Sequence, residues 1–204
     1  MVGFSGCGKS TLLDLLAMIL QPDAAEQFLF RPDPSESMDV AHLWELHDYN
    51  KLASARLNNI GYVLQTGGLL PFLTVAENIG LSPSALGKKP AEQIEILSEK
   101  LGIHNHLKKL PAALSVGERQ RVAIARAMAH KPDLILADEP TASLDPINAE
   151  KIMQLFNQLA EERNITLILA THEWERVSAS GFRRITFELE ELPTQATVRS
   201  RVSG

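Results

Sequence analysis

A glycine-rich stretch at the start of the chain has the residue types and spacing of a phosphate-binding loop. Residues 3–11 read Gly-Phe-Ser-Gly-Cys-Gly-Lys-Ser-Thr and fit the pattern G-x-x-x-x-G-K-[S/T]. In such a loop, backbone N–H groups surround phosphate oxygens, and glycines allow the chain to approach them closely. Lys9 supplies a positive charge to the β- and γ-phosphates, and the Ser10 hydroxyl is placed to ligate Mg²⁺. The predicted phosphate-binding residues are Gly3, Ser5, Gly6, Cys7, Gly8, Lys9, Ser10 and Thr11.

Polar residues also follow three apolar runs farther along the chain. Gln65 ends the run 60–65, Asp138 and Glu139 follow residues 134–137, and His172 comes shortly after residues 165–170. Short apolar runs of this kind are typical of buried parallel strands, whose carboxyl ends collect ligands at one edge of the sheet. We therefore expect these polar residues to lie at the same edge as the phosphate loop.

This set of residues has the chemistry for phosphoryl transfer to water. Asp138 is predicted to hold Mg²⁺ together with Ser10 and Gln65. Glu139 is the candidate general base, because a second carboxylate beside the metal ligand could take a proton from the attacking water. His172 and Gln65 are candidates for orienting that water or the γ-phosphate.

The elements that must position these residues alternate between helix and strand. Helical patterns cover 11–20, 39–57, 119–130 and 147–164, and a further helical region, 77–110, is expected to break at Ser82-Pro83 and again at 87–90. Ser115 and Glu118 have capping-box spacing before the helix at 119–130. Alternation of this kind predicts an α/β fold with a mostly parallel sheet. We expect one domain over 1–190, a helical subdomain over about 72–130, a last edge strand over 184–189 and a disordered tail over 191–204.

The composition narrows the class of protein. The 204 residues are 45% apolar and carry a formal net charge of -5, which argues against nucleic acid as a partner. The single cysteine, Cys7, excludes a disulfide framework and favours a reducing cytoplasm. No stretch approaches the roughly 18–20 apolar residues that cross a bilayer. We therefore expect a soluble protein whose connection to a membrane runs through a partner.

Several motifs together resemble the ATP-binding subunit of ABC transporters, a family of P-loop NTPases. Residues 114–121 read Leu-Ser-Val-Gly-Glu-Arg-Gln-Arg, residues 134–140 follow, and then comes Ser143-Leu144-Asp145. The phosphate loop, Gln65 and Thr171-His172 stand in the family's order. The resemblance covers residues 3–189. Within the family, the chain most resembles the lipoprotein-release and macrolide-export group.

The resemblance implies a role for each motif. ATP and Mg²⁺ would be bound between two antiparallel subunits, with Glu139 as base, Asp138 on the metal, Gln65 sensing the membrane subunit and His172 as the switch histidine. The signature loop, which would contact the γ-phosphate held by the other subunit, is Ser115, Val116, Gly117 and Glu118. The loop that would bridge the two sites contains Ser143 and Asp145. This implies an ATPase on the cytoplasmic face of the inner membrane, bound to an integral membrane transporter subunit.

One residue of the signature departs from the family's usual pattern, and one apolar stretch has two possible interpretations. Val116 stands where the family usually has glycine, and a backbone with positive φ there would be strained. The apolar stretch 69–75 is either core or an exposed surface that helps to receive the partner's cytoplasmic helix.

A cytosolic ABC-type ATPase without transport, of the iron–sulfur assembly or cell-division type, is the alternative function. A DNA-repair ATPase ranks last, because the long insertion expected before the signature is missing.

The start of the chain is the remaining departure. A phosphate loop directly follows a β-strand, yet only Met1 and Val2 precede Gly3 in this sequence. Family members place further strands and an adenine-stacking aromatic residue before it. We therefore expect the N-terminal strands to be missing, through truncation or a start site placed too late. In that case we expect poor folding or weak ATP binding.

Overall fold

The computed structural model describes residues 1–4, 6–32, 35–172, 182–191 and 198–203. Its helices are α1 (Lys9–Leu16), α2 (Val40–Glu45), α3 (Tyr49–Asn59), α4 (Val75–Ala85), α5 (Ala91–Lys100), α6 (Val116–Met128) and α7 (Pro146–Glu162). Its strands are β1 (Leu29–Phe30), β2 (Met38–Asp39), β3 (Ile60–Val63), β4 (Leu134–Asp138), β5 (Thr166–Ala170), β6 (Thr186–Glu191) and β7 (Val198–Ser203).

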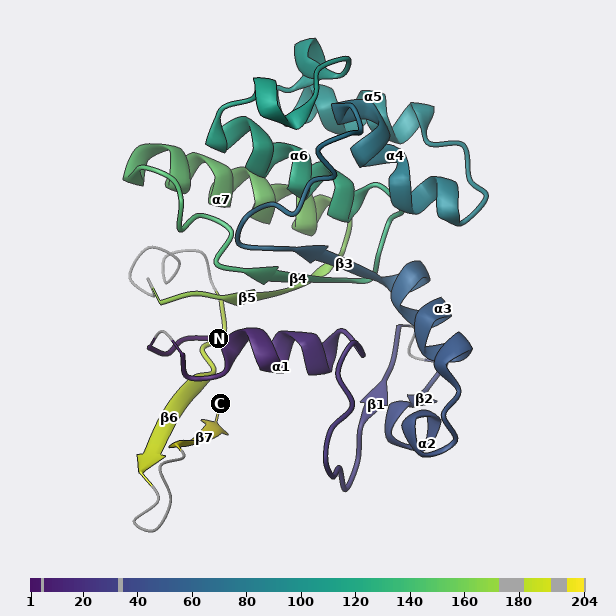
Figure 1. The fold of residues 1–204 in the computed structure, drawn as a ribbon, viewed down its shortest axis with the longest axis vertical. Helices are drawn as coiled ribbons and strands as arrows, with labels where there is room; N and C mark the ends of the chain where they lie inside the picture. The colour runs from purple at the N-terminus through teal and green to yellow at the C-terminus, as the bar shows by residue number, and fades with distance from the viewer. Residues whose placement is uncertain (5, 33–34, 173–181, 192–197, 204) are drawn as a thin grey trace.

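A parallel sheet in the order β3-β4-β5 lies between two helical layers. The strands pair in register, with Ile60 opposite Leu134 and Leu134 opposite Thr166. Helix α1 lies along one face of the sheet, while α6 and α7 cover the other, and α4 and α5 lie beyond α6 (Figure 1). The expected α/β class with a parallel sheet is confirmed.

Alternate residues of β4 face two separate cores. Ile135 and Ala137 pack with residues of α6 and α7, whereas Leu136 packs with residues of α1, α2 and α3. All three are fully buried. A strand covered on both faces must be apolar at successive positions, which is why the run at 134–137 was readable in the sequence. Within the described residues, no helix has both the length and the apolar composition needed to cross a membrane.

The first two residues extend the sheet beyond β5. The amide of Thr171 donates to the carbonyl of Met1 at 3.0 Å, and the amide of Val2 donates to that of Ile185 at 2.8 Å. Val2 thus forms parallel bridges to Thr171 on one side and Thr186 on the other. These contacts carry the chain directly from the sheet into the phosphate loop.

The expected last strand is present over 186–191 rather than 184–189, whereas part of the expected disordered tail forms a further strand. The strand β6 begins at Thr186 and runs to Glu191, and it pairs antiparallel with β7 over residues 198–203. Backbone pairing between the two segments, with Phe187 opposite Val202, orders a stretch whose composition alone predicted disorder. Residues 192–197 and 204 of that tail lie outside the described residues.

Buried His130, just after α6, predicts a pH dependence of stability. Its Nε2 lies 3.2 Å from the carbonyl of Ile60 and its exposed fraction is 3%. Burial, aided by the charge of Lys88, lowers the pKa of His130 below its usual 6.5. As pH falls below 6.5 the unfolded chain binds a proton that the folded chain refuses, so the free energy of unfolding decreases.

We expect His130→Gln to reduce this dependence, because glutamine can still donate to Ile60 and does not titrate. The measurement is urea unfolding of both proteins at pH 7.5 and 5.5, where the wild type should lose about 1 kcal/mol more than the variant. Equal losses in the two proteins would show that His130 does not cause the pH dependence.

Candidate functional site

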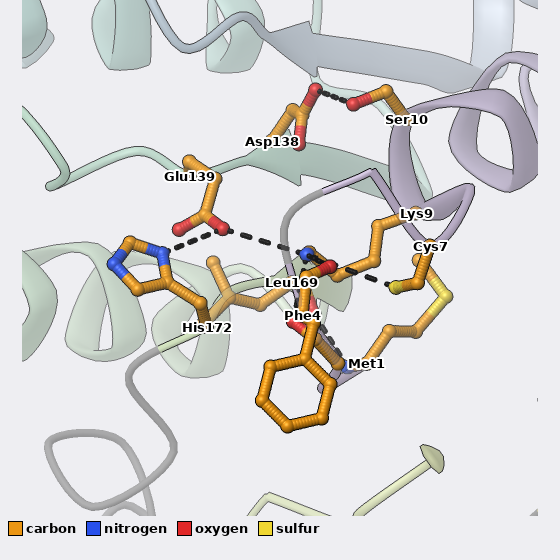
Figure 2. A network of polar contacts seen from close by, with 10 residues as sticks. Met1, Phe4, Cys7, Lys9, Ser10, Asp138, Glu139, Leu169 and His172 are labelled. Carbon is orange, nitrogen blue, oxygen red and sulfur yellow. Dashed lines mark hydrogen bonds and ion pairs between the residues drawn. The ribbon is translucent and has the colours of Figure 1, made fainter. Parts of the chain in front are cut away.

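The phosphate loop closes on its own lysine. Gly8, whose φ of 92° favours glycine, is the N-cap of α1, and Lys9 is the first residue of the helix. The Nζ atom of Lys9 donates to the carbonyls of Gly3 and Phe4, each at 2.9 Å (Figure 2). The loop therefore encloses a buried ammonium group at a helix N-terminus, the arrangement that binds phosphate. Ser5, also predicted to bind phosphate, lies outside the described residues.

Ser10 and Asp138 are joined directly, although 128 positions separate them in the chain. The hydroxyl of Ser10 donates to Oδ2 of Asp138 at 2.6 Å, and Asp138 is the last residue of β4 (Figure 2). A hydroxyl and a carboxylate oxygen at one point are ligands that suit Mg²⁺, which prefers oxygen. The residues present therefore fit the expected metal.

Glu139 lies between the phosphate loop and His172. Its Oε1 is 2.9 Å from Nδ1 of His172 and 3.9 Å from Nζ of Lys9 (Figure 2). Its backbone φ of 44° is in the left-handed region, which residues other than glycine adopt infrequently. This conformation turns the chain sharply after β4, at the edge where the loop lies.

Within the described part of the chain, Gln65 and Thr11 lie outside the hydrogen-bond network of Lys9, Glu139 and His172. Gln65 follows β3 and is exposed, and among the described residues no hydrogen bond or ion pair joins it to the other candidates. Thr11 is exposed in the first turn of α1. Gln65 therefore lies at the edge of the sheet where the sequence predicts it. Its contacts with Mg²⁺ and with the attacking water remain predictions.

The predicted capping box at the signature loop is confirmed. The hydroxyl of Ser115 accepts from the amide of Glu118 at 3.3 Å, and Oε2 of Glu118 accepts from the amide of Ser115 at 2.7 Å. The bond from the Ser115 amide, more than any other contact, lowers the pKa of Glu118. Val116 is the first residue of α6 and does not have a positive φ, so the valine introduces none of the strain that its position suggested.

The loop containing Ser143 and Asp145 lies beside the signature loop. Asp145 caps α7, where its Oδ1 accepts from the amide of Asn148 at 3.1 Å. Hydrogen bonds from Asn148 lower the pKa of Asp145. The two loops line a hollow of about 420 Å³, whose lining is Gly102, Ser115, Val116, Gly117, Glu118, Arg121, Ser143, Leu144, Asp145 and Asn148. The structure therefore brings the two predicted interface motifs together on one surface.

Tyr62 is a supporting residue that the sequence did not reveal. Its hydroxyl donates to Oδ1 of Asp14 at 2.9 Å and so joins β3 to the phosphate-loop helix α1. Burial, with the neighbouring carboxylates, raises the pKa of Tyr62. The two residues are 48 positions apart, and neither belongs to a motif, so no local signal could have paired them.

We expect Tyr62→Phe to lower the free energy of unfolding by about 1–2 kcal/mol, because it leaves a partly buried carboxylate without its donor. Urea unfolding measures this loss. The exposed Tyr49 provides the matched control, and Tyr49→Phe should change stability by less than about 0.5 kcal/mol. Similar losses in the two variants would contradict the prediction.

Taken together, the fold and the site define a class. A parallel sheet delivers a glycine-rich loop, a lysine at a helix N-terminus, and a serine–aspartate pair to one edge. These are the parts of a P-loop nucleotide-binding protein.

Comparison with known proteins narrows the class to a family. Residues 1–142 match the family model described as ABC transporter. The chain is 42% identical over 175 residues to the lipoprotein-releasing system ATP-binding protein LolD of Idiomarina loihiensis, covering 84% of this chain and 72% of that protein. It is 39% identical over 180 residues to the macrolide export ATP-binding/permease protein MacB of Rhodopirellula baltica, covering 86% of this chain and 25% of that protein.

Solved structures of ATP-binding cassettes also match the fold of this chain. A dimeric post-hydrolysis structure of the ATP-binding cassette MJ0796, bound to ADP and Pi, matches with a TM-score of 0.68 at 32% identity, over 86% of this chain and 74% of that one. The structure of cbiO1 from Clostridium perfringens, a part of the ABC transporter complex cbiONQ, matches with a TM-score of 0.70 at 29% identity, over 87% of this chain and 68% of that one. The chain therefore belongs to the ABC transporter family, as an ATP-binding cassette, and the resemblance seen in its motifs is confirmed.

Proposed function

We propose that this cassette hydrolyses ATP with Mg²⁺ and, as a dimer, powers a membrane transporter subunit. The observation that carries the proposal is the convergence of Lys9, Ser10, Asp138, Glu139 and His172 at one edge of the sheet. Each of these side chains supplies one part of phosphoryl transfer: charge neutralisation, metal ligation, base and orientation.

Lys9 and the loop amides hold the phosphates, and Ser10 with Asp138 holds Mg²⁺, which neutralises charge on the phosphate oxygens when bound. Glu139 accepts the proton of the attacking water, because its carboxylate lies beside Lys9 at the phosphate end of the site. His172 holds that carboxylate through Nδ1 and orients it. Gln65, at the end of β3, would supply a further ligand to Mg²⁺ and help to orient the water.

A second subunit completes the site. The signature residues Ser115 and Gly117 begin α6, and a helix N-terminus favours the γ-phosphate of a nucleotide held by another subunit. The neighbouring Ser143 and Asp145 line the same hollow and connect the two sites. In this arrangement residues 1–190 act as the ATP-binding domain, with the helical part over about 72–130 carrying the signature loop.

The apolar stretch 69–75 supports a membrane partner. Val75 is fully buried, whereas Phe72 is 72% exposed, so the stretch is anchored in the core and presents an aromatic side chain outward. We place the cassette on the cytoplasmic face of the membrane, where this apolar surface receives a cytoplasmic helix of the transporter subunit.

The metal assignment is tested with Asp138→Asn. Loss of the carboxylate charge weakens Mg²⁺ binding, so the variant should need at least about 10-fold more Mg²⁺ for half-maximal ATP hydrolysis. The assay is phosphate release at fixed ATP over a Mg²⁺ series. The exposed Asp23 is the control, since Asp23→Asn should follow the wild-type curve. An unchanged Mg²⁺ requirement in Asp138→Asn would remove Asp138 from the metal site.

The transporter assignment is tested by affinity capture from solubilised membranes of the source cell. An integral membrane protein should be recovered with the wild type and reduced with Phe72→Ser, which removes exposed apolar area. Recovery of no integral membrane protein would favour the alternative, a cytosolic ABC-type ATPase.

A further inference from the structure

The loop that follows Gln65 is held against α6 by a single guanidinium group. In Arg126, Nη1 donates to the carbonyl of Gly68 at 2.7 Å and Nη2 donates to that of Gly67 at 2.9 Å. Both bonds are short, and they leave through the two terminal nitrogens of a planar group. Such a two-pronged contact fixes both the position and the orientation of the loop.

The loop is shaped to present these carbonyls. The amide of Gly67 donates to the carbonyl of Leu64 at 2.8 Å, which closes a turn around Gln65. Gly67 and Gly68 have φ of 74° and 56°, which favour glycine. On the helix side, a Cβ added to Gly67 would lie 3.6 Å from the Cβ of Ala123 and 3.8 Å from Oε1 of Gln120. The turn therefore rests directly on α6.

The charge of Arg126 is costly where it lies. The side chain is partly buried, and burial lowers the pKa of its guanidinium. Across the part of the chain that the structure describes, no carboxylate forms an ion pair with it. A methionine or leucine would fill the space without placing a charge against carbonyl dipoles alone. This cost indicates that the contact with the loop serves more than packing.

We propose that Arg126 is a positioning residue that makes the Gln65 loop and the signature loop one mechanical unit. Arg126 grips the loop from near the end of α6, and Ser115 caps the start of the same helix, about 16 Å away at 1.5 Å per residue. A displacement of the Gln65 loop is thereby transmitted along α6 to the signature loop. The inference rests on the proposed function, in which both loops contact the nucleotide site.

The first test is the kinetics of Arg126→Gln. A loosened loop misplaces Gln65 without touching the phosphate loop, so kcat should fall about 10-fold while the KM for ATP changes less than about 2-fold. Arg163→Gln is the matched control, because Arg163 also bonds one carbonyl at the end of α6, that of Met128 at 3.3 Å, far from the loop in sequence. The control should keep kcat within about 2-fold of wild type. Arg126→Lys, which keeps the charge without the fork, should show a smaller loss and serves if Arg126→Gln does not fold.

The second test asks whether Arg126 acts through Gln65. If it does, adding Arg126→Gln to Gln65→Ala should lower kcat by less than about 2-fold beyond Gln65→Ala alone. Multiplying losses would overturn the inference.

Hydrogen exchange of the wild type, Arg126→Lys and Arg163→Gln gives a readout independent of ATP hydrolysis. Amides of residues 67–70 should exchange at least about 10-fold faster in Arg126→Lys and unchanged in Arg163→Gln. Faster amide exchange in a chain without ATPase activity would support the positioning role of Arg126 and count against the proposed function. Unchanged exchange would overturn the positioning role of Arg126 even in an active enzyme.

Discussion

Glu139→Gln is expected to stop ATP turnover while leaving ATP bound. The amide cannot accept the proton of the attacking water, and loss of a general base costs about 10²–10⁴-fold in rate. The phosphate loop is unchanged, because Lys9 bonds to the carbonyls of Gly3 and Phe4 independently of Glu139. Removal of the negative charge 3.9 Å from Lys9 should, in addition, favour the polyphosphate. The variant should therefore trap ATP and favour a dimer.

The measurements are phosphate release and size-exclusion chromatography with light scattering, both with ATP and Mg²⁺. Glu161→Gln is a matched control, since it removes an exposed carboxylate on α7 and should keep wild-type turnover. If Glu139→Gln hydrolysed ATP at the wild-type rate, Glu139 would not be the base. Turnover lost without ATP trapping would point instead to damage of the binding site.

Gly61→Ala should lower the free energy of unfolding by about 3 kcal/mol, the largest effect on stability that we expect. Gly61 lies in β3 directly under α6, and an added Cβ would lie 2.2 Å from the carbonyl oxygen of Ala127. That oxygen belongs to helix backbone, which cannot rotate away as a side chain can. The helix or the strand must therefore shift, and both position parts of the proposed site.

Urea or thermal unfolding measures this loss, and Gly117→Ala gives a control of opposite sign. A Cβ at Gly117 would meet its nearest neighbour, Cδ2 of Leu144, at 3.8 Å, an ordinary contact. Alanine in a helix is favoured over glycine by roughly 0.5–1 kcal/mol, so Gly117→Ala should be slightly stabilising. A Gly61→Ala variant as stable as wild type would mean that β3 and α6 are not packed as described.

The parts of the site that could be predicted are those with a local signal. The phosphate loop has a fixed spacing. The buried strand β4 and the strand β5, which is buried only at its last two residues, are runs of apolar residues that end on polar ones. The capping box of Ser115 and Glu118 is likewise a short-range pattern. From these, the α/β class and the edge of the sheet that holds the site follow.

Predictions of element boundaries were less successful, and the reasons are local conformations that composition does not encode. The helical pattern at 39–57 is two helices, because His47 has a φ of 54° and Asp48 then caps α3. The expected break at Ser82-Pro83 is wrong, since α4 continues through Pro83 to Ala85, whereas the expected break at 87–90 is confirmed, because α5 begins at Ala91. A proline so close to a helix end removes little of the hydrogen-bond ladder.

Two other contacts between distant segments belong to no motif and could not be predicted. The grip of Arg126 on Gly67 and Gly68 spans 58 or 59 positions, and the strand pairing of β6 with β7 depends on how two segments meet. A single sequence contains no pairing information of this kind.

The bonds of Lys9 to its own loop have a consequence for selectivity among anions. An ammonium group has three N–H donors, and the carbonyls of Gly3 and Phe4 accept from two of them, so a phosphate meets a charge whose position is already fixed. A small anion such as chloride or acetate can use few of the donors that the loop offers. A polyphosphate can meet the ammonium group, the loop amides and the helix end together, which favours it over the small anion. The fixed lysine thus favours anions with several charged oxygens over anions that offer a single contact.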